Sequence, residues 1–103
     1  MIKVSVLYPN GAETRFDMDY YLAQHMPMVK AKLGAACKAM AVEHGLGGAQ
    51  PGSSPAFIAM GHLYFDSVAA FQEAFGAHAE AIVADIPNYT NAQPTIQLSE
   101  VKL

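Results

Sequence analysis

The sequence predicts a single α+β domain in which strands and helices follow one another in the order β-α-β-β-α-β. Two segments, at the two ends of the chain, alternate apolar and polar residues, which is typical of strands with one buried face, and two short segments between them are also read as strands. Two further segments repeat apolar residues at intervals of three and four, which is typical of amphipathic helices. The chain has 103 residues, and we expect residues 1–103 to form this one domain.

The first strand and the first helix are predicted from the first third of the chain. The opening MIKVSVLY alternates and forms the strand, and turn residues follow it in PNG. Asp17 is the expected N-cap of the helix, and Gly34 is its expected terminator. The apolar stripe that should face the core consists of Met18, Leu22, Met26, Val29 and Leu33.

Pro27 lies in the middle of this predicted helix, two residues after His25. Proline has no N–H and its ring crowds the preceding turn, so we expect the helix to kink or that turn to loosen, at a cost of about 3 kcal/mol before relief. The carbonyl of Ala23 then lacks its helical partner. A water, a tyrosine hydroxyl or a ligand could use this acceptor beside His25.

The rest of the chain predicts two strands, a second helix and a last strand. AACKAMAVEHGL and AFIAMGHLYFD form the two strands, and the glycine- and proline-rich GLGGAQPGSSP connects them. Asp66 or Ser67 caps the second helix, Gly76 bends it and Pro87 ends it. TIQLSEVKL alternates again and forms the fourth strand.

This order is that of the ferredoxin-like plait, in which two helices cover one face of a four-stranded antiparallel sheet. Ala59 and Gly61 are small enough to let helices approach, so their face is assigned to the helices, together with Val4, Val6, Phe57, Leu63, Phe65, Ile96 and Leu98. The other face mixes apolar and hydrogen-bonding residues, namely Ser5, Leu7, Ile58, Met60, His62, Tyr64, Thr95, Gln97, Ser99 and Val101. We expect a homodimer that covers this face and encloses a cavity.

Composition excludes several classes of protein. Apolar residues make up 52% of the chain and charged residues 15%, which excludes a disordered chain. The net charge is −3 and no basic run occurs, so we expect neither nucleic acid nor a membrane surface as a partner. Cys37 is the only cysteine, and no export signal or membrane span is recognised, so we expect a cytoplasmic protein.

Familiar cofactor and metal motifs are missing from the sequence. GLGGAQ has Gln50 where a dinucleotide fingerprint needs its last glycine, and no P-loop lysine follows. No histidine pair has the i,i+4 spacing of a helical metal site. We therefore predict no cofactor and no metal, with a haem held by histidine as a remote alternative.

Three segments, FDMDYYLAQHMPMV, HLYFDSVAAFQ and DIPNYTNAQPTIQ, resemble the EthD family of dimeric α+β barrel proteins. The resemblance implies a ferredoxin-like fold, a dimer with its sheets facing inward, and bacterial catabolism of small organic molecules such as ether degradation. It also implies an oxidoreductase or reductase activity. The positions that match, and that are candidates on this ground, are Tyr20, Tyr21, His25, Pro27 and the loop from Asn88 to Asn91.

His25 and Tyr21 are the predicted catalytic residues. Imidazole titrates near neutral pH and suits proton transfer at a carbon next to a carbonyl, and a tyrosine can stabilise the developing oxyanion. A histidine beside a core stripe is as often part of the packing alone. The predicted substrate-binding residues are Tyr20, Met60, His62, Tyr64, Asn88, Tyr89 and Asn91.

These observations lead to two hypotheses of different classes. In the first, the protein is a small catabolic enzyme or accessory protein that holds an apolar, oxygen-bearing metabolite in a dimer cavity, with His25 as proton-transfer or orienting group. In the second, the same cavity stores or carries a hydrophobic compound without turning it over.

Overall fold

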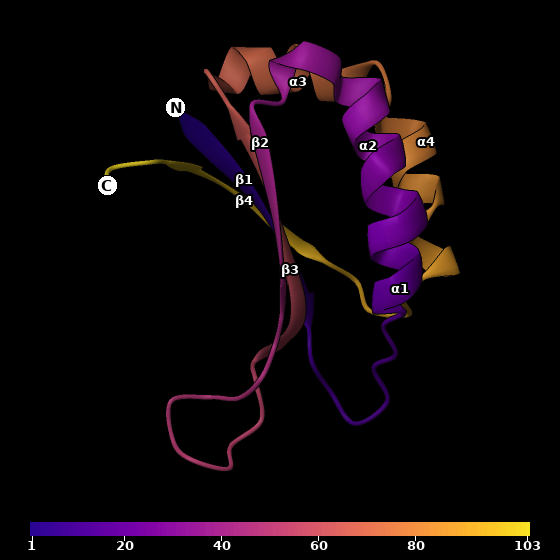
Figure 1. The fold of residues 1–103 in the computed structure, drawn as a ribbon, viewed down its shortest axis with the longest axis vertical. Coiled ribbons are helices and arrows are strands. Elements are labelled where there is room, and N and C mark those ends of the chain that lie inside the picture. Colours follow the sequence, from indigo (N-terminus) through magenta and orange to yellow (C-terminus); the bar gives the residue numbers. More distant parts are fainter.

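The protein is described by a computed structural model that covers residues 1–103 and contains one four-stranded antiparallel sheet. Its strands are β1 (Ile2–Pro9), β2 (Ala39–His44), β3 (Phe57–Phe65) and β4 (Thr95–Glu100). They lie side by side in the order β2-β3-β1-β4, so β1 and β3 form the centre (Figure 1). The predicted ferredoxin-like plan is confirmed.

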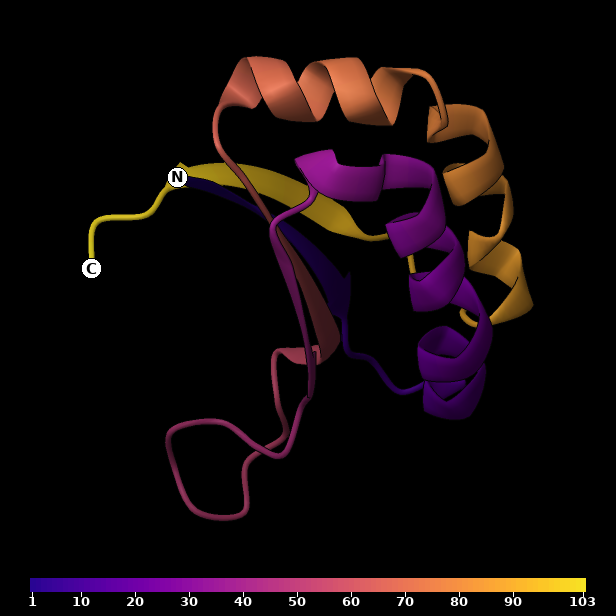
Figure 2. The same cartoon turned by 45° about the horizontal axis from the view of Figure 1, so that its top comes forward.

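The helices all cover one face of this sheet (Figures 1 and 2). The second predicted helix is in fact two helices, because the chain breaks after Gly76, a residue of low helix propensity. Figure 2 shows the chain turning sharply there, so that the second of the two lies beside the first helical segment. The helices are α1 (Met18–Tyr20), α2 (Met26–Leu33), α3 (Val68–Gly76) and α4 (Ala79–Ala84).

Three of the predicted helix ends are confirmed, but Pro87 does not end the second helix, because α4 ends at Ala84 and Pro87 lies within a 3₁₀ turn over Ile86–Asn88. The Asp17 carboxylate accepts a hydrogen bond from the Tyr20 backbone N–H at 3.0 Å, and the Ser67 hydroxyl accepts one from the Ala70 N–H at 3.1 Å. Gly34 ends α2 with φ of +61°, a conformation that glycine adopts without steric cost.

The turn that precedes Pro27 is loosened, as the sequence predicts. Residues Tyr21–His25 form a π-helical turn, and the Met26 N–H donates to the carbonyl of Tyr21 five residues earlier. The extra residue in this turn rotates the helix about its axis, so that different residues face the sheet. Leu22, which the periodicity placed in the core, is 51% exposed, whereas Tyr21 and His25 are buried.

The two faces of the sheet are those that the alternation predicts. Val4, Ala59 and Leu63 are buried under the helices. At the β4 edge, however, Ile96 is on the helix side and still 52% exposed. On the helix-free face, His62 is held between two neighbours, with Ser5 Oγ 2.9 Å from its Nδ1 and Glu43 Oε1 3.1 Å from its Nε2.

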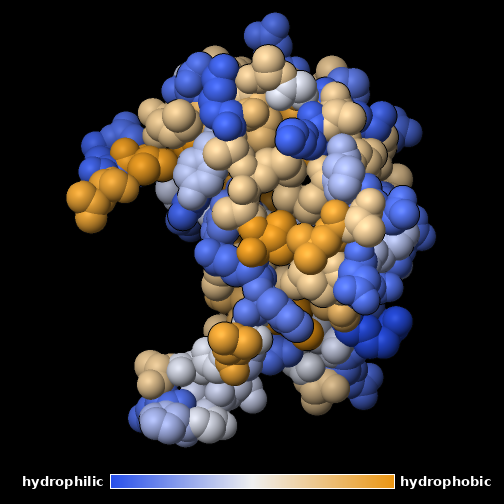
Figure 3. Space-filling model, in the orientation of Figure 1, coloured by the Kyte–Doolittle hydropathy of each residue, from blue (hydrophilic) through white to orange (hydrophobic).

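Two features of the surface complete the fold. The connection between β2 and β3 projects away from the body of the molecule (Figures 1 and 2). Apolar side chains gather between α2 and β2, where a shallow groove is lined by Leu22, Met26, Pro27, Met40 and Val42 among others (Figure 3). None of the helices has both the length and the apolar character needed to cross a membrane.

Gly61 in β3 makes room for Tyr21, because a Cβ atom at this position would collide with the Tyr21 hydroxyl oxygen. We predict that Gly61→Ala lowers the free energy of unfolding by about 1–3 kcal/mol, the usual cost of overpacking. Tyr21→Phe removes the colliding oxygen and leaves the ring carbon Cζ 3.5 Å away. The double variant should therefore lose less stability than the sum of the single variants. Urea denaturation of the four proteins measures this coupling, and simple additivity would contradict the prediction.

Candidate active site

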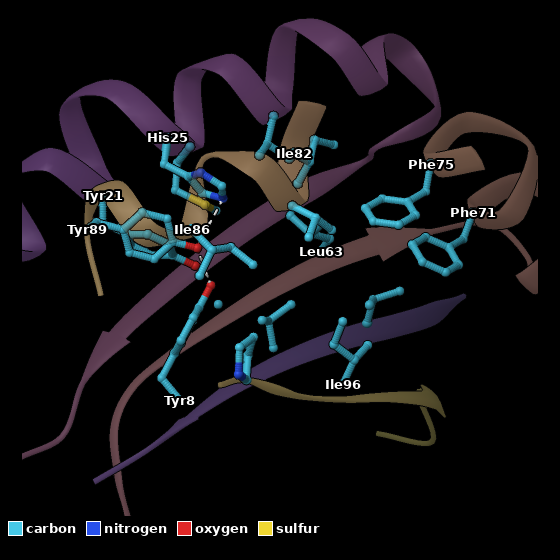
Figure 4. Close-up of a pocket in the computed structure, with 17 residues that line it drawn as sticks. Tyr8, Tyr21, His25, Leu63, Phe71, Phe75, Ile82, Ile86, Tyr89 and Ile96 are labelled. Atoms are coloured by element: carbon cyan, nitrogen blue, oxygen red, sulfur yellow. Dashed lines mark hydrogen bonds between the residues drawn. The ribbon is translucent and has the colours of Figure 1, made fainter. Parts of the chain in front are cut away.

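A cavity of about 70 Å³ lies between the helices and the sheet (Figure 4). Of the 17 residues that line it, 14 are hydrophobic, so a ligand must be mainly apolar to bind there. β1, β3 and β4 form one wall, and the helical segments from both halves of the chain form the other. The lining residues include Val4, Val6, Tyr8, Tyr21, His25, Val29, Gly61, Leu63, Phe71, Phe75, Ile82, Val83, Ile86, Tyr89 and Ile96.

One end of this cavity is polar and is formed by His25 and three tyrosines. The Tyr8 and Tyr89 hydroxyl oxygens are 2.7 Å apart, and the Tyr89 oxygen is 3.5 Å from His25 Nε2. Figure 4 shows these groups pointing toward one another from β1, the π turn and the segment after α4. The rings of Tyr21 and His25 are stacked, with centroids 5.3 Å apart and planes only 13° from parallel. The widened turn explains this alignment, because it brings residues i and i+4 more nearly into line than an α-helix does.

Asp85 lies behind His25, on the side away from the cavity. Its Oδ2 accepts a hydrogen bond from His25 Nδ1–H at 2.9 Å, since an ionised carboxylate can only accept. Its Oδ1 accepts from the Tyr20 hydroxyl at 2.7 Å and from the Asn88 amide at 2.9 Å. The carboxylate thus fixes the tautomer of His25 and leaves Nε2 as an acceptor on the cavity side.

Burial sets the protonation states of these groups. It lowers the pKa of His25, and the hydrogen bond to Asp85 offsets this only in part, so the imidazole is neutral at neutral pH. Burial would raise the pKa of Asp85, but hydrogen bonds from Asn88, Tyr20 and His25 together hold it below its usual range. Burial raises the pKa of Tyr8, Tyr21 and Tyr89, which therefore stay protonated as donors.

This arrangement can perform general acid–base chemistry. A neutral imidazole nitrogen with a fixed tautomer can take a proton from a bound molecule. Protonated tyrosines beside it can donate hydrogen bonds to an oxygen that gains negative charge. The apolar walls surround both groups with few polar neighbours, so both interactions are stronger there than in bulk water.

The structure brings together some of the sequence-predicted site residues and separates the others. Tyr21, His25 and Tyr89 line the cavity, and Tyr20 and Asn88 hold Asp85. Within one subunit the candidates do not share a cavity, because some lie on the helix-covered side of the sheet and others on its helix-free face. Met60, His62 and Tyr64 lie on the helix-free face, and the Asn91 side chain ties down backbone groups of Arg15 and Glu13.

Sequence reasoning missed Asp85 and Tyr8. Tyr8 shares its strand face with Val4 and Val6, so carrying the alternation one step further would have placed it in the cavity. Asp85 is the C-cap of α4, an unfavourable place for a negative charge because of the helix dipole. A carboxylate at such a position is a signal that another interaction holds it there.

A haem does not fit these residues. The cavity of about 70 Å³ is far below the range of roughly 300–1,000 Å³ that larger ligands occupy. Both ring nitrogens of His25 face protein partners, Asp85 and Tyr89. Both nitrogens of His62 are engaged as well, by Ser5 and Glu43.

The fold and this site define a ferredoxin-like α+β domain with a histidine and tyrosines at the end of an apolar cavity. The family model described as "EthD domain" matches residues 10–93, and the chain belongs to this family. The crystal structure of an EthD-like protein from Ralstonia eutropha JMP134 is similar, with 48% sequence identity and a TM-score of 0.95. The match covers 99% of this chain and 92% of that chain.

Two more distant structures share the fold. An ethyl tert-butyl ether D (EthD) family protein from Bacillus halodurans C-125 has 20% identity and a TM-score of 0.67, with 99% of each chain covered. HapK from Hahella chejuensis has 12% identity and a TM-score of 0.60, with 99% of this chain and 93% of that chain covered. A comparison with curated proteins found no match.

The lowered pKa of His25 predicts a pH dependence of stability. As the pH falls below about 6.5, the usual value, the unfolded chain takes up a proton at His25 that the folded protein resists. The free energy of unfolding should therefore decrease as the pH falls from this usual value to below the lowered pKa of His25 in the folded protein. His25→Gln lacks this component, so urea denaturation between about pH 8 and pH 5 should show a shallower decrease for the variant. An identical pH slope for both proteins would contradict the prediction.

Proposed function

We propose that the protein is a small-molecule catabolic enzyme that transfers a proton at a carbon next to a carbonyl group of an apolar metabolite. One observation carries the proposal. His25 presents Nε2, with its tautomer fixed by Asp85, to a cavity whose lining is almost wholly apolar. This cavity lies within one subunit, between the helices and the sheet.

The proton transfer balances with the groups that are present. His25 Nε2 takes the proton of the C–H bond, and the electron pair of that bond moves toward the carbonyl oxygen. The hydroxyls of Tyr21 and Tyr89 donate hydrogen bonds to the resulting enolate oxygen. The imidazolium then returns the proton to the same carbon or to a conjugated one. An oxidoreductase of the kind that the family resemblance implies would start from the same enolate, with dioxygen as the oxidant.

A carrier function is the alternative, and the closed hydrogen-bond network favours it. No buried side-chain nitrogen or oxygen lacks a partner, and both nitrogens of His25 have one. A site that is satisfied without ligand can hold an apolar compound by packing alone. In that case His25 positions the tyrosines and reacts with nothing.

Measurements of turnover and of ligand binding distinguish the enzyme from the carrier. We predict that the protein catalyses exchange of the α-hydrogens of small ketones for deuterium in D₂O, followed by NMR of the ketone. His25→Gln keeps size and polarity but has no basic nitrogen, so the exchange rate should fall at least about 100-fold, the low end of what a general base contributes. Ligand affinity should change only a few-fold.

His62→Gln is the matched control, because His62 lies on the other face of the sheet. This variant should retain the exchange rate. Binding of ketones without any exchange in the wild-type protein would support the carrier and refute the enzyme.

We further propose a homodimer through the helix-free face, which presents Leu7 and Met60 beside hydrogen-bonding residues. A subunit interface combines an apolar centre with hydrogen-bonding groups, and this face offers both. His62 and Tyr64 would then contact the second copy rather than the substrate.

Met60→Lys tests this assembly. It places a charge in the centre of the proposed interface and should raise the dimer dissociation constant at least tenfold in sedimentation velocity experiments. Leu22→Lys, on the helix side, should leave the dissociation constant unchanged. A wild-type protein that stays monomeric at millimolar concentration would refute the dimer.

A further inference from the structure

The cavity continues onto an apolar surface at the β4 edge of the sheet. Ile96 and Val83 line the cavity, yet each is 52% exposed. Leu98 follows Ile96 on the same face of β4 and is 38% exposed. We refer to Val83, Ile96 and Leu98 as the β4 rim. Exposed apolar patches mark ligand-binding grooves as well as protein interfaces, and the continuity of this one with a cavity favours a ligand.

The size of the cavity limits what can be buried completely. An engineered cavity of about 150 Å³ accommodates benzene, and the cavity here has about 70 Å³. A six-membered ring therefore exceeds the space beside His25, whereas the end of an extended chain fits. Any longer part of the ligand must lie outside, along the β4 rim.

The lack of charged residues in the cavity lining favours an uncharged ligand. No lysine, arginine, aspartate or glutamate lines the cavity, and the nearest charge is the Asp85 carboxylate behind His25. A carboxylate ligand would be buried without a cationic partner and close to a second negative charge, which is strongly unfavourable. A carbonyl oxygen needs only the hydroxyl donors that are present.

From these three observations we infer that the site takes linear, uncharged carbonyl compounds such as methyl ketones and aliphatic aldehydes. The carbonyl group enters first and reaches His25 and the tyrosines, and the hydrocarbon tail lies along the β4 rim. The inference deepens the proposed function and rests on it for the use of the carbonyl group. Its binding geometry is tested separately from turnover.

The test measures binding of 2-alkanones from butanone to nonanone, by calorimetry and by NMR shifts of the His25 ring. Each methylene that packs against the β4 rim should tighten binding about twofold to fourfold, where about fourfold is the equivalent of roughly 0.8 kcal/mol for a fully buried CH₂ and about twofold that of half burial. Fatty acids of equal length should bind at least tenfold more weakly. Acetophenone, which carries a ring next to its carbonyl, should also bind more weakly than 2-octanone, the linear ketone with the same number of carbons.

Two variants locate the tail. Ile96→Asn should reduce the gain per methylene, and Val83→Asn should do the same from the helix side of the rim. Leu22→Asn is the matched control, because Leu22 is 51% exposed but belongs to the separate groove between α2 and β2. Its chain-length dependence should equal that of the wild type. Circular dichroism checks that each variant is folded.

Several outcomes would overturn the inference. These are no binding at any chain length, equal affinity for acids and ketones, and an unchanged chain-length dependence in both rim variants. A change of oligomeric state in Ile96→Asn would show that a second copy covers the rim instead. If the affinity rises with chain length but no deuterium exchange occurs, only the proposed function is refuted. If butanone exchanges its hydrogens but the affinity does not change with chain length, only this inference is refuted.

Discussion

The arrangement of the site depends on the widened helical turn before Pro27. Proline cannot donate a backbone hydrogen bond, and its ring crowds the carbonyl of the residue four positions earlier, so a regular α-helical turn is unfavourable there. The chain adopts a π turn over Tyr21–His25 instead. This turn adds one residue to the helical repeat, and it is the reason that Tyr21 and His25 face the sheet while Leu22 faces water.

The rest of the site is built around this turn by residues from distant parts of the chain. Gly61 in the central strand β3 leaves space for the Tyr21 hydroxyl. The break between α3 and α4 lets α4 lie beside α2, and its C-cap Asp85 then reaches His25 across 60 positions of sequence. The 3₁₀ turn after α4 adds Asn88 and brings Tyr89 next to the imidazole.

Much of the fold could be predicted from sequence because it follows local rules. Alternation located β1 and β4, and Asp17, Ser67 and Gly34 marked helix ends by their own side-chain and backbone chemistry. The site was harder, because the pairing of His25 with Asp85 depends on how two helices meet and has no local signature. The separation of His62 from His25 was within reach, since strand parity already placed His62 away from the helices.

The division of roles between His25 and Asp85 follows from where water reaches them. The Asp85 side chain is 16% exposed and lines a groove between α2 and α4 that is half polar and half apolar, together with Tyr20, Gln24 and Asn88. The His25 side chain is 5% exposed and faces the apolar cavity. On the groove side, which is partly exposed, the ionised carboxylate loses less hydration free energy. On the cavity side, which is buried, the neutral form of the imidazole is favoured. The negative charge therefore orients the base without entering the cavity, which keeps the cavity suited to uncharged, apolar molecules.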